Sequence, residues 1–138
     1  MCIRDSKETE RILCESDFMI LNTGDQAGFP HSKIISRPLL RQSYHSMKFY
    51  LNADSKTIKN AHKNRKGSLY VFQSATRESL LLKGLLTVEP ISAYDSISRQ
   101  LDNFQKLFNY SNPVILCFEI MTVDYIKSNP MLEYNHFL

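Results

Sequence analysis

The sequence has no long hydrophobic run and few cysteines, and these absences limit what the protein can be. No apolar stretch approaches the roughly 18–20 residues that a membrane-spanning helix needs. The N-terminus, MCIRDSKETER, is charged and lacks the apolar segment of a secretory signal, so we expect a cytoplasmic protein without a membrane partner. Only three cysteines are present and none forms a CxxC pair, which argues against a zinc site and predicts reduced thiols.

What is present is sufficient for one folded domain. The chain has 138 residues, of which 43% are hydrophobic, and this length and composition suit a domain with its own core. We therefore predict a single domain over residues 1–138. The opening Met1–Ser6 resembles translated adapter sequence rather than native sequence, so the fold argument does not depend on it.

Most predicted strands follow one another without a helix between them. The predicted helices are Ser6–Glu15, a short helix that starts at Asp54 or Ser55 and is closed by Gly67, and Ser92–Tyr110. The predicted strands are Phe18–Thr23, Pro30–Leu40, Met47–Leu51, Ser68–Gln73, Ser79–Glu89, Val114–Ile120 and, as a seventh, Val123–Lys127. Six or seven strands with two or three helices predict a mainly β (α+β) fold, an antiparallel barrel rather than a doubly wound parallel sheet. Gly84 lies inside a strand, which indicates a bulge or a close backbone approach.

A basic block follows the third strand. Ser55–Gly67 reads SKTIKNAHKNRKG and holds five of the 17 basic residues and no acidic one. A helix that starts at Ser55 presents free N–H groups, a hydroxyl and the charge of Lys56, which together favour a phosphate. The alternative is that Ser55 only caps the helix and that the lysines form a solvated face.

The second strand has an unusual polar face. Period-two alternation places His31, Lys33 and Arg37 on one face together with Ile35, and Ser32, Ile34 and Ser36 on the other. Three groups that can be cationic on one strand face indicate an anionic or polar ligand. The alternative is a solvent-facing sheet edge.

Several of these segments, in this order, resemble the FMN-binding split barrels of the pyridoxamine 5'-phosphate oxidase-like superfamily. LNTGDQAGFPHSKIISRP is similar to their first hairpin, and FYLNADSKTIKNAHKNRKGSLYVF to their strand, Ser-Lys loop, helix and next strand. LLLKGLLTVE is similar to the family strand that carries a central glycine. The chain ends EYNHFL without the substrate-binding segment of the oxidases, so the resemblance favours the general-stress-protein branch and not oxidation of pyridoxamine phosphate.

The resemblance implies an FMN site at a homodimer interface. In it, Lys33, Ser55 and Lys56 would bind the phosphate. The isoalloxazine would lie along Ile34, Ile35, Ser36, Tyr50 and Leu51. Thr57 stands where the oxidases have a second lysine, and Ser79 near a glutamine that reaches the flavin, so both positions depart from the family pattern.

Three functions remain open from the sequence. The first is a flavoprotein that binds FMN and oxidises or reduces a small-molecule substrate. The second is the same barrel with deazaflavin or haem, where haem would need one of His31, His45, His62 or His136 as its axial ligand. The third is a cofactor-free module that binds nucleic acid or another anion through Ser55–Gly67, and the net charge of only +3 argues against it.

Overall fold

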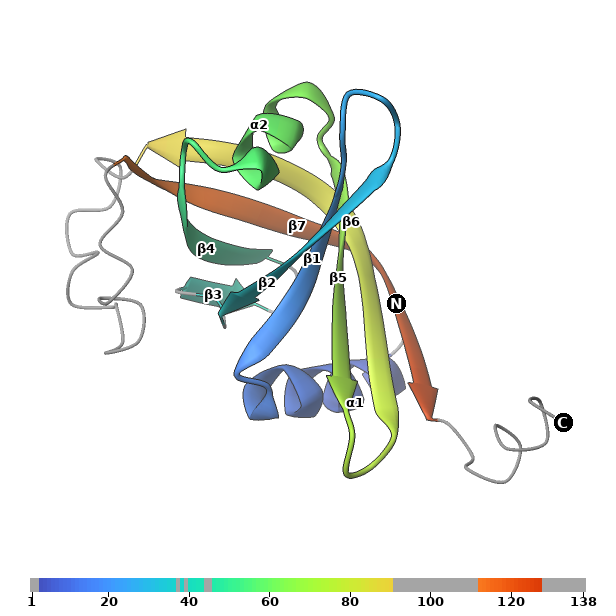
Figure 1. The fold of residues 1–138 in the computed structure, drawn as a ribbon. Coiled ribbons are helices and arrows are strands. Elements are labelled where there is room, and N and C mark those ends of the chain that lie inside the picture. The colour runs from blue at the N-terminus through green and yellow to red at the C-terminus, as the bar shows by residue number, and fades with distance from the viewer. Residues whose placement is uncertain (1–2, 37, 39, 44–45, 91–111, 128–138) are drawn as a thin grey trace, which may run out of the picture.

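The computed structural model describes residues 3–36, 38, 40–43, 46–90 and 112–127 (Figure 1). Its elements are α1 (Ile3–Glu15), β1 (Phe18–Gly24), β2 (Pro30–Ser36), β3 (Leu40–Ser43), β4 (Ser46–Asn52), α2 (Lys56–Lys63), β5 (Lys66–Gln73), β6 (Glu78–Pro90) and β7 (Pro113–Lys127). The predicted helix Ser92–Tyr110 lies outside the described residues. In the described part of the chain, no helix is both long and apolar enough to cross a membrane.

The seven strands form one antiparallel sheet in the order β2-β1-β5-β6-β7-β4-β3. The sheet curls into an open barrel, with α1 at one end and α2 at the other (Figure 1). This confirms the predicted antiparallel split β-barrel with flanking helices. The last described strand, β7, lies between β6 and β4 and joins the two halves of the sheet.

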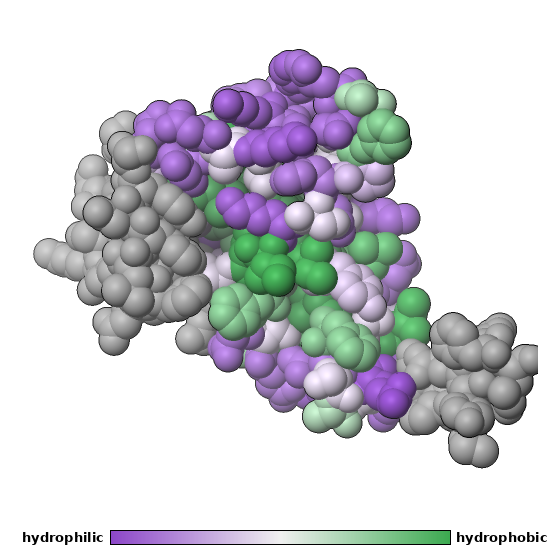
Figure 2. Space-filling view, in the orientation of Figure 1, coloured by the Kyte–Doolittle hydropathy of each residue, from purple (hydrophilic) through white to green (hydrophobic). Residues whose placement is uncertain are grey.

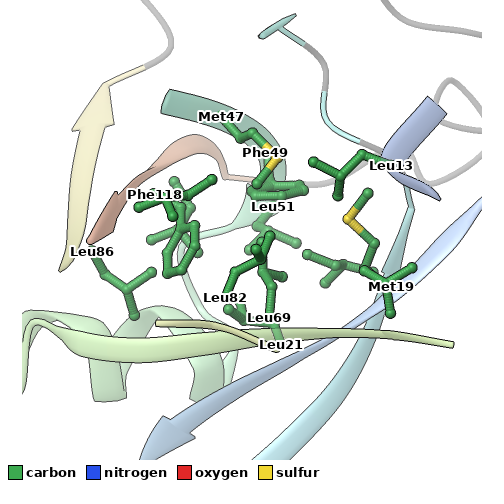
Figure 3. Close-up of a cluster of buried hydrophobic side chains, with 14 of the residues drawn as sticks. Leu13, Met19, Leu21, Met47, Phe49, Leu51, Leu69, Leu82, Leu86 and Phe118 are labelled. Carbon is green, nitrogen blue, oxygen red and sulfur yellow. The ribbon is translucent and has the colours of Figure 1, made fainter. Parts of the chain in front are cut away.

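Strand alternation builds the core of the barrel. On β4, Met47, Phe49 and Leu51 are buried, while the residues between them are half-buried. These side chains meet those of β1, β5, β6 and β7 inside the barrel (Figure 3). Each buried side chain of this size stabilises the fold by about 1.5–3 kcal/mol. The core therefore fixes the register of β4, the strand that leads into α2.

The predicted irregularity at Gly84 is confirmed. The register of β6 and β7 shifts between Lys83 and Gly84, and Met121 of β7 has no partner in that register. A Cβ atom on Gly84 would lie 2.0 Å from the backbone oxygen of Glu119. Glycine is needed here because the two backbones approach too closely for a side chain.

Several boundaries differ from the prediction, and α1 begins at Ile3 rather than at Ser6. The strand predicted over Pro30–Leu40 is divided into β2 and β3 around Pro38, which has no N–H to donate to a sheet. Gly67 does not end the helix but lies within β5, where a Cβ atom would approach Leu86 Cδ1 to 2.7 Å. The two predicted C-terminal strands form one strand, β7.

The outer face of β2, β1, β5, β6 and β7 carries an apolar patch. Its members are exposed side chains on neighbouring strands: Phe18, Ile20, Ile34, Phe72 and Ile126. Figure 2 shows apolar side chains gathered on this face between polar regions. Ile34, which is 69% exposed, and Phe72, which is 54% exposed, leave large apolar surfaces in contact with water. Such a patch is typical of an interaction surface.

Glu78 ties α1 to the start of β6. Its side chain is only 4% exposed and accepts hydrogen bonds from Arg11 and from the Tyr125 hydroxyl. Arg11, followed by Tyr125 and Thr76, holds the pKa of Glu78 at about 2, below its ordinary 4.5.

We expect Glu78→Gln to destabilise the fold at neutral pH and to remove one source of acid sensitivity. Because the folded pKa is lowered, the Glu78 carboxylate contributes stability above pH 4.5 that is lost as pH falls towards 2. Thermal unfolding followed by circular dichroism across this range should show a smaller Tm difference between wild type and Glu78→Gln as pH falls. Asp17→Asn, at an exposed carboxylate, is the control. A Tm difference that is constant over the range would contradict this role of Glu78.

Candidate functional site

The N-terminus of α2 is built by Ser55. Its backbone is extended, and its Oγ accepts a hydrogen bond from the N–H of Ile58 at 3.4 Å. Of the two predicted caps, Asp54 and Ser55, the structure selects Ser55. The first turn holds no acidic residue, so the positive end of the helix dipole is not neutralised from within the helix.

Thr57 has an unsatisfied hydroxyl beside this helix start. The residue is 1% exposed, and its Oγ1 has no hydrogen-bond partner among the described residues. A buried polar atom without a partner is unusual, because it loses its water without replacement. Thr57 lies on the buried face of α2 and does not line the pocket beside the helix, so it is not placed to contact a ligand there. Ser55 and Lys56, with the free N–H groups of the helix start, have the chemistry that fits a phosphate group.

A basic pocket of about 360 Å³ lies between α2 and the turn from β1 to β2. The turn contributes Asp25–Ala27, and the helix contributes Lys56, Lys59, Asn60 and Lys63. Asn60 is buried and donates a hydrogen bond from Nδ2 to Thr23 Oγ1 at 3.1 Å, which ties the helix to β1. The pocket wall is therefore held by two elements that are distant in sequence.

Sequence reasoning assigned Lys56 to the phosphate site, placed Lys59 and Lys63 only in the basic block Ser55–Gly67, and did not identify Asn60. Their spacing contained the signal, because residues three and four apart share one face of a helix. The same geometry explains why His62 is not among the buried residues of α2. The buried face of α2 is centred on Thr57 and Ala61, and His62, about 100° further round the helix, is exposed.

On β2, the alternation of burial from His31 to Ile35 agrees with the two predicted faces, and Arg37 lies outside the described residues. Lys33 is half-buried on the inner side of the strand, and Ile34 is exposed on the outer side. Burial lowers the pKa of Lys33, as expected for a cation removed from water. Lys33 does not line the pocket beside α2. It lies on the same side of β2 as the buried Ile35.

The other residues predicted to contact the flavin ring differ in whether their side chains are accessible to a ligand. Leu51 is 3% exposed and Ile35 is 4% exposed, so both side chains belong to the core and only their backbones can meet a ligand. Ser36 and Tyr50 are half-buried and can contribute side chains. Among the described residues, no group of three His, Cys, Asp or Glu side chains could hold a metal ion.

Comparison with known proteins identifies the architecture. No protein-family model matches the chain, and no curated protein matches it in sequence. Solved structures do match. A Clostridium acetobutylicum protein related to general stress protein 26 has a TM-score of 0.78 at 17% identity, over 92% of this chain and 91% of that chain. General stress protein 26 from Bacillus anthracis has a TM-score of 0.73 at 16% identity, over 90% and 95%.

A pyridoxamine 5'-phosphate oxidase-related, FMN-binding protein from Nostoc punctiforme matches with a TM-score of 0.70 at 16% identity, over 91% of this chain and 82% of that chain. The fold is that of the pyridoxamine 5'-phosphate oxidase-like split barrels. Other split barrels that match include an F420 reductase, with a TM-score of 0.64, and a haem-binding protein from Mycobacterium smegmatis, with a TM-score of 0.72. The proteins that match this fold therefore differ in the cofactors that they are described as using.

Ser79 does not join the other predicted residues within one split barrel. It lies at the start of β6, directly after the turn from β5, whereas α2 lies at the opposite end of the sheet (Figure 1). Ser79 is 8% exposed and is aligned with Phe72 and Ile126. Ser79 could meet a ligand held by α2 only if it came from a second copy of the chain.

Proposed function

We propose that this chain is a flavoprotein that binds FMN and serves as a flavin-dependent oxidoreductase of a small substrate. The observation that carries the proposal is the start of α2, where the Ser55 cap and Lys56 lie on a split barrel beside a pocket that Lys59 and Lys63 also line. A phosphate there would receive helix N–H groups, a hydroxyl and an ammonium. Lys33, half-buried on the inner side of β2, would supply a second cation.

The chain's own residues would bind and orient the cofactor. Backbone groups of Ile34, Ile35, Ser36 and Leu51, with the Tyr50 side chain, would border the ring system, while the phosphate fixes the opposite end. When bound, FMN supplies the redox chemistry, and the protein supplies position and electrostatics. The lysines at positions 59 and 63 add positive potential near the phosphate end.

We also propose that the working form is a homodimer whose second copy completes the flavin site. The apolar patch gives each copy a surface that is suited to a two-fold interface. Ser79 lies beside Phe72 in that patch and not near α2 of its own chain. A dimer across this face is the arrangement that lets one chain offer Ser79 to a ligand held by the other.

We expect FMN to bind more tightly than riboflavin, and Lys56→Ala to remove most of that difference. Hydrogen bonds to a charged phosphate contribute roughly 1.5–3 kcal/mol each, so loss of one should weaken FMN by about ten- to a hundredfold. Quenching of flavin fluorescence measures both ligands on the same protein. Lys7→Ala, at an exposed lysine of α1, is the matched control. Equal affinities of the wild-type protein for FMN and riboflavin would refute the phosphate site.

The second candidate is a split barrel that carries deazaflavin or haem, because matching structures include an F420 reductase and a haem-binding protein. For haem, His31 is the better of the two described histidines, since it is half-buried on β2 while His62 is exposed. The visible absorption spectrum of the purified protein distinguishes these cofactors. A flavin spectrum supports the first proposal, and a Soret band supports haem.

A further inference from the structure

A second group of reactive side chains lies on the outer face of β4, β7 and β6. Cys117 on β7 is paired in register with Lys48 on β4 and with Thr87 on β6, and Glu89 follows two residues after Thr87. Side chains two residues apart on a strand point to the same face. The sheet therefore brings a thiol, an ammonium and a carboxylate together from three neighbouring strands.

The three groups contact one another. Lys48 Nζ lies 3.2 Å from Cys117 Sγ, and the thiol donates to Glu89 Oε1 at 2.9 Å. Lys48 Nζ is also 3.6 Å from Glu89 Oε1, so the three side chains form a closed triangle. Lys48 is held away from bulk water, with its side chain 13% exposed. A nucleophile with a base in hydrogen-bond reach, and a third group that orients both, is the arrangement that activates side chains for covalent chemistry.

The triangle faces a cavity and is not sealed in the core. A pocket of about 410 Å³ is lined by the three residues together with Ser46, Leu85, Thr87 and Glu119. The described residues of its lining include two carboxylates, of Glu89 and Glu119, and one ammonium, of Lys48, and this balance disfavours anionic ligands. None of these residues lines the pocket beside α2.

Cys117 is held as a neutral thiol at rest. Burial, together with the hydrogen bond to Glu89, raises the pKa of the thiol above its ordinary value of 9.0, and the hydrogen bond from Lys48 opposes this. A thiol with a raised pKa is rarely ionised, so it reacts slowly without help. Glu89 can accept its proton while the sulfur attacks.

We propose that Cys117, Glu89 and Lys48 form a second reactive site, at which Cys117 accepts the acyl group of a small, neutral or cationic, activated acyl compound. The Cys117 proton passes to Glu89 Oε1 while Sγ forms a bond to the carbonyl carbon. The carbonyl oxygen takes the negative charge, which the Lys48 ammonium stabilises. When the carbonyl re-forms, the bond to the leaving group breaks and that group takes the proton from Glu89. The products are a thioester and the protonated leaving group, with no change in oxidation state.

The probe is p-nitrophenyl acetate, a neutral activated ester. We expect acetylation of Cys117, measured by peptide mass spectrometry and by release of p-nitrophenolate, to exceed acetylation of the more exposed Cys14 in the same chain. Glu89→Gln should slow acetylation of Cys117 by about a hundredfold or more, the usual contribution of a general base. Lys48→Met should slow it as well, and Cys14→Ser should leave it unchanged.

Comparison of Cys117 with Cys14 within the wild-type protein needs no variant, so the test stands even if a substitution disturbs folding. Acetylation of Cys117 no faster than that of Cys14 would overturn the proposal. An unchanged rate at Cys117 in a folded Glu89→Gln protein, verified by circular dichroism, would also overturn it. The result does not depend on which cofactor α2 binds, because acyl transfer to a thiol requires none.

Discussion

Gly84→Ala is expected to lower the free energy of unfolding by about 3 kcal/mol or more, at or above the upper end of typical overpacking penalties. The added Cβ atom would lie 2.0 Å from the oxygen and 2.9 Å from the carbon of the Glu119 carbonyl. Both are backbone atoms of the neighbouring strand, so no side chain can rotate to relieve the clash. Alanine would also lower the conformational entropy of the unfolded chain, and this would offset only about 0.4–1 kcal/mol of the destabilisation. Urea unfolding followed by circular dichroism measures the difference.

Gly24→Ala is the matched control for this effect. A Cβ atom at Gly24 would meet only the side-chain nitrogen of Asn64, at 3.3 Å, and that side chain can move. We expect a change below about 1 kcal/mol there. Equal destabilisation by the two substitutions would show that the bulge does not require glycine at Gly84.

Phe72→Asp is expected to convert the proposed dimer into a monomer and to weaken FMN binding. Loss of a central aromatic contact at an interface costs about 2 kcal/mol or more. Two-fold symmetry applies this loss twice, which predicts a dissociation constant of the dimer that is higher by about a thousandfold. Light scattering during size exclusion gives the mass. Flavin titration of the same sample gives the affinity for FMN, which should fall because Ser79 of the second copy is no longer held in place.

Phe29→Asp is the control for this experiment. Phe29 is 68% exposed, more than Phe72, but it lies in the turn from β1 to β2 and not in the apolar patch. We expect this variant to remain a dimer. A monomeric Phe72→Asp protein that binds FMN as tightly as wild type would refute the shared site, and a monomeric wild-type protein would refute the dimer.

Local signals in the sequence predicted most of the barrel. Short segments rich in apolar residues and bounded by turn or polar residues located β1, β4 and β5 within about two residues. The helix start at Asp54 or Ser55 could be predicted because a cap is determined by its neighbours in the chain, and Gly84 could be predicted as irregular because a glycine inside a strand is unusual. The site residues at the start of α2 were accessible to sequence reasoning through that cap.

What could not be predicted depends on contacts between distant segments. The pairing of β3 with β4 and the contact of Asn60 with Thr23 both depend on how the sheet curls. Two reduced thiols in a packed interior are the expectation for Cys14 and Cys117, but Cys14 is exposed and Cys117 is half-buried beside Lys48, 69 residues away. A periodic pattern in the local sequence does not indicate a neighbour that is so distant in the chain. The unsatisfied hydroxyl of Thr57 is likewise visible only once its surroundings are placed.

The position of β7 in the middle of the sheet has a consequence for how the chain folds. Before β7 pairs, β2-β1-β5-β6 and β4-β3 are two separate half-sheets, and β6 and β4 each expose an edge. The strand that closes the gap comes last among the described strands, so its pairing with β4 spans a long loop and is entropically slow. A chain emerging from the ribosome would therefore present two open edges until Pro113–Lys127 is released, and this interval is when it would be most prone to aggregate.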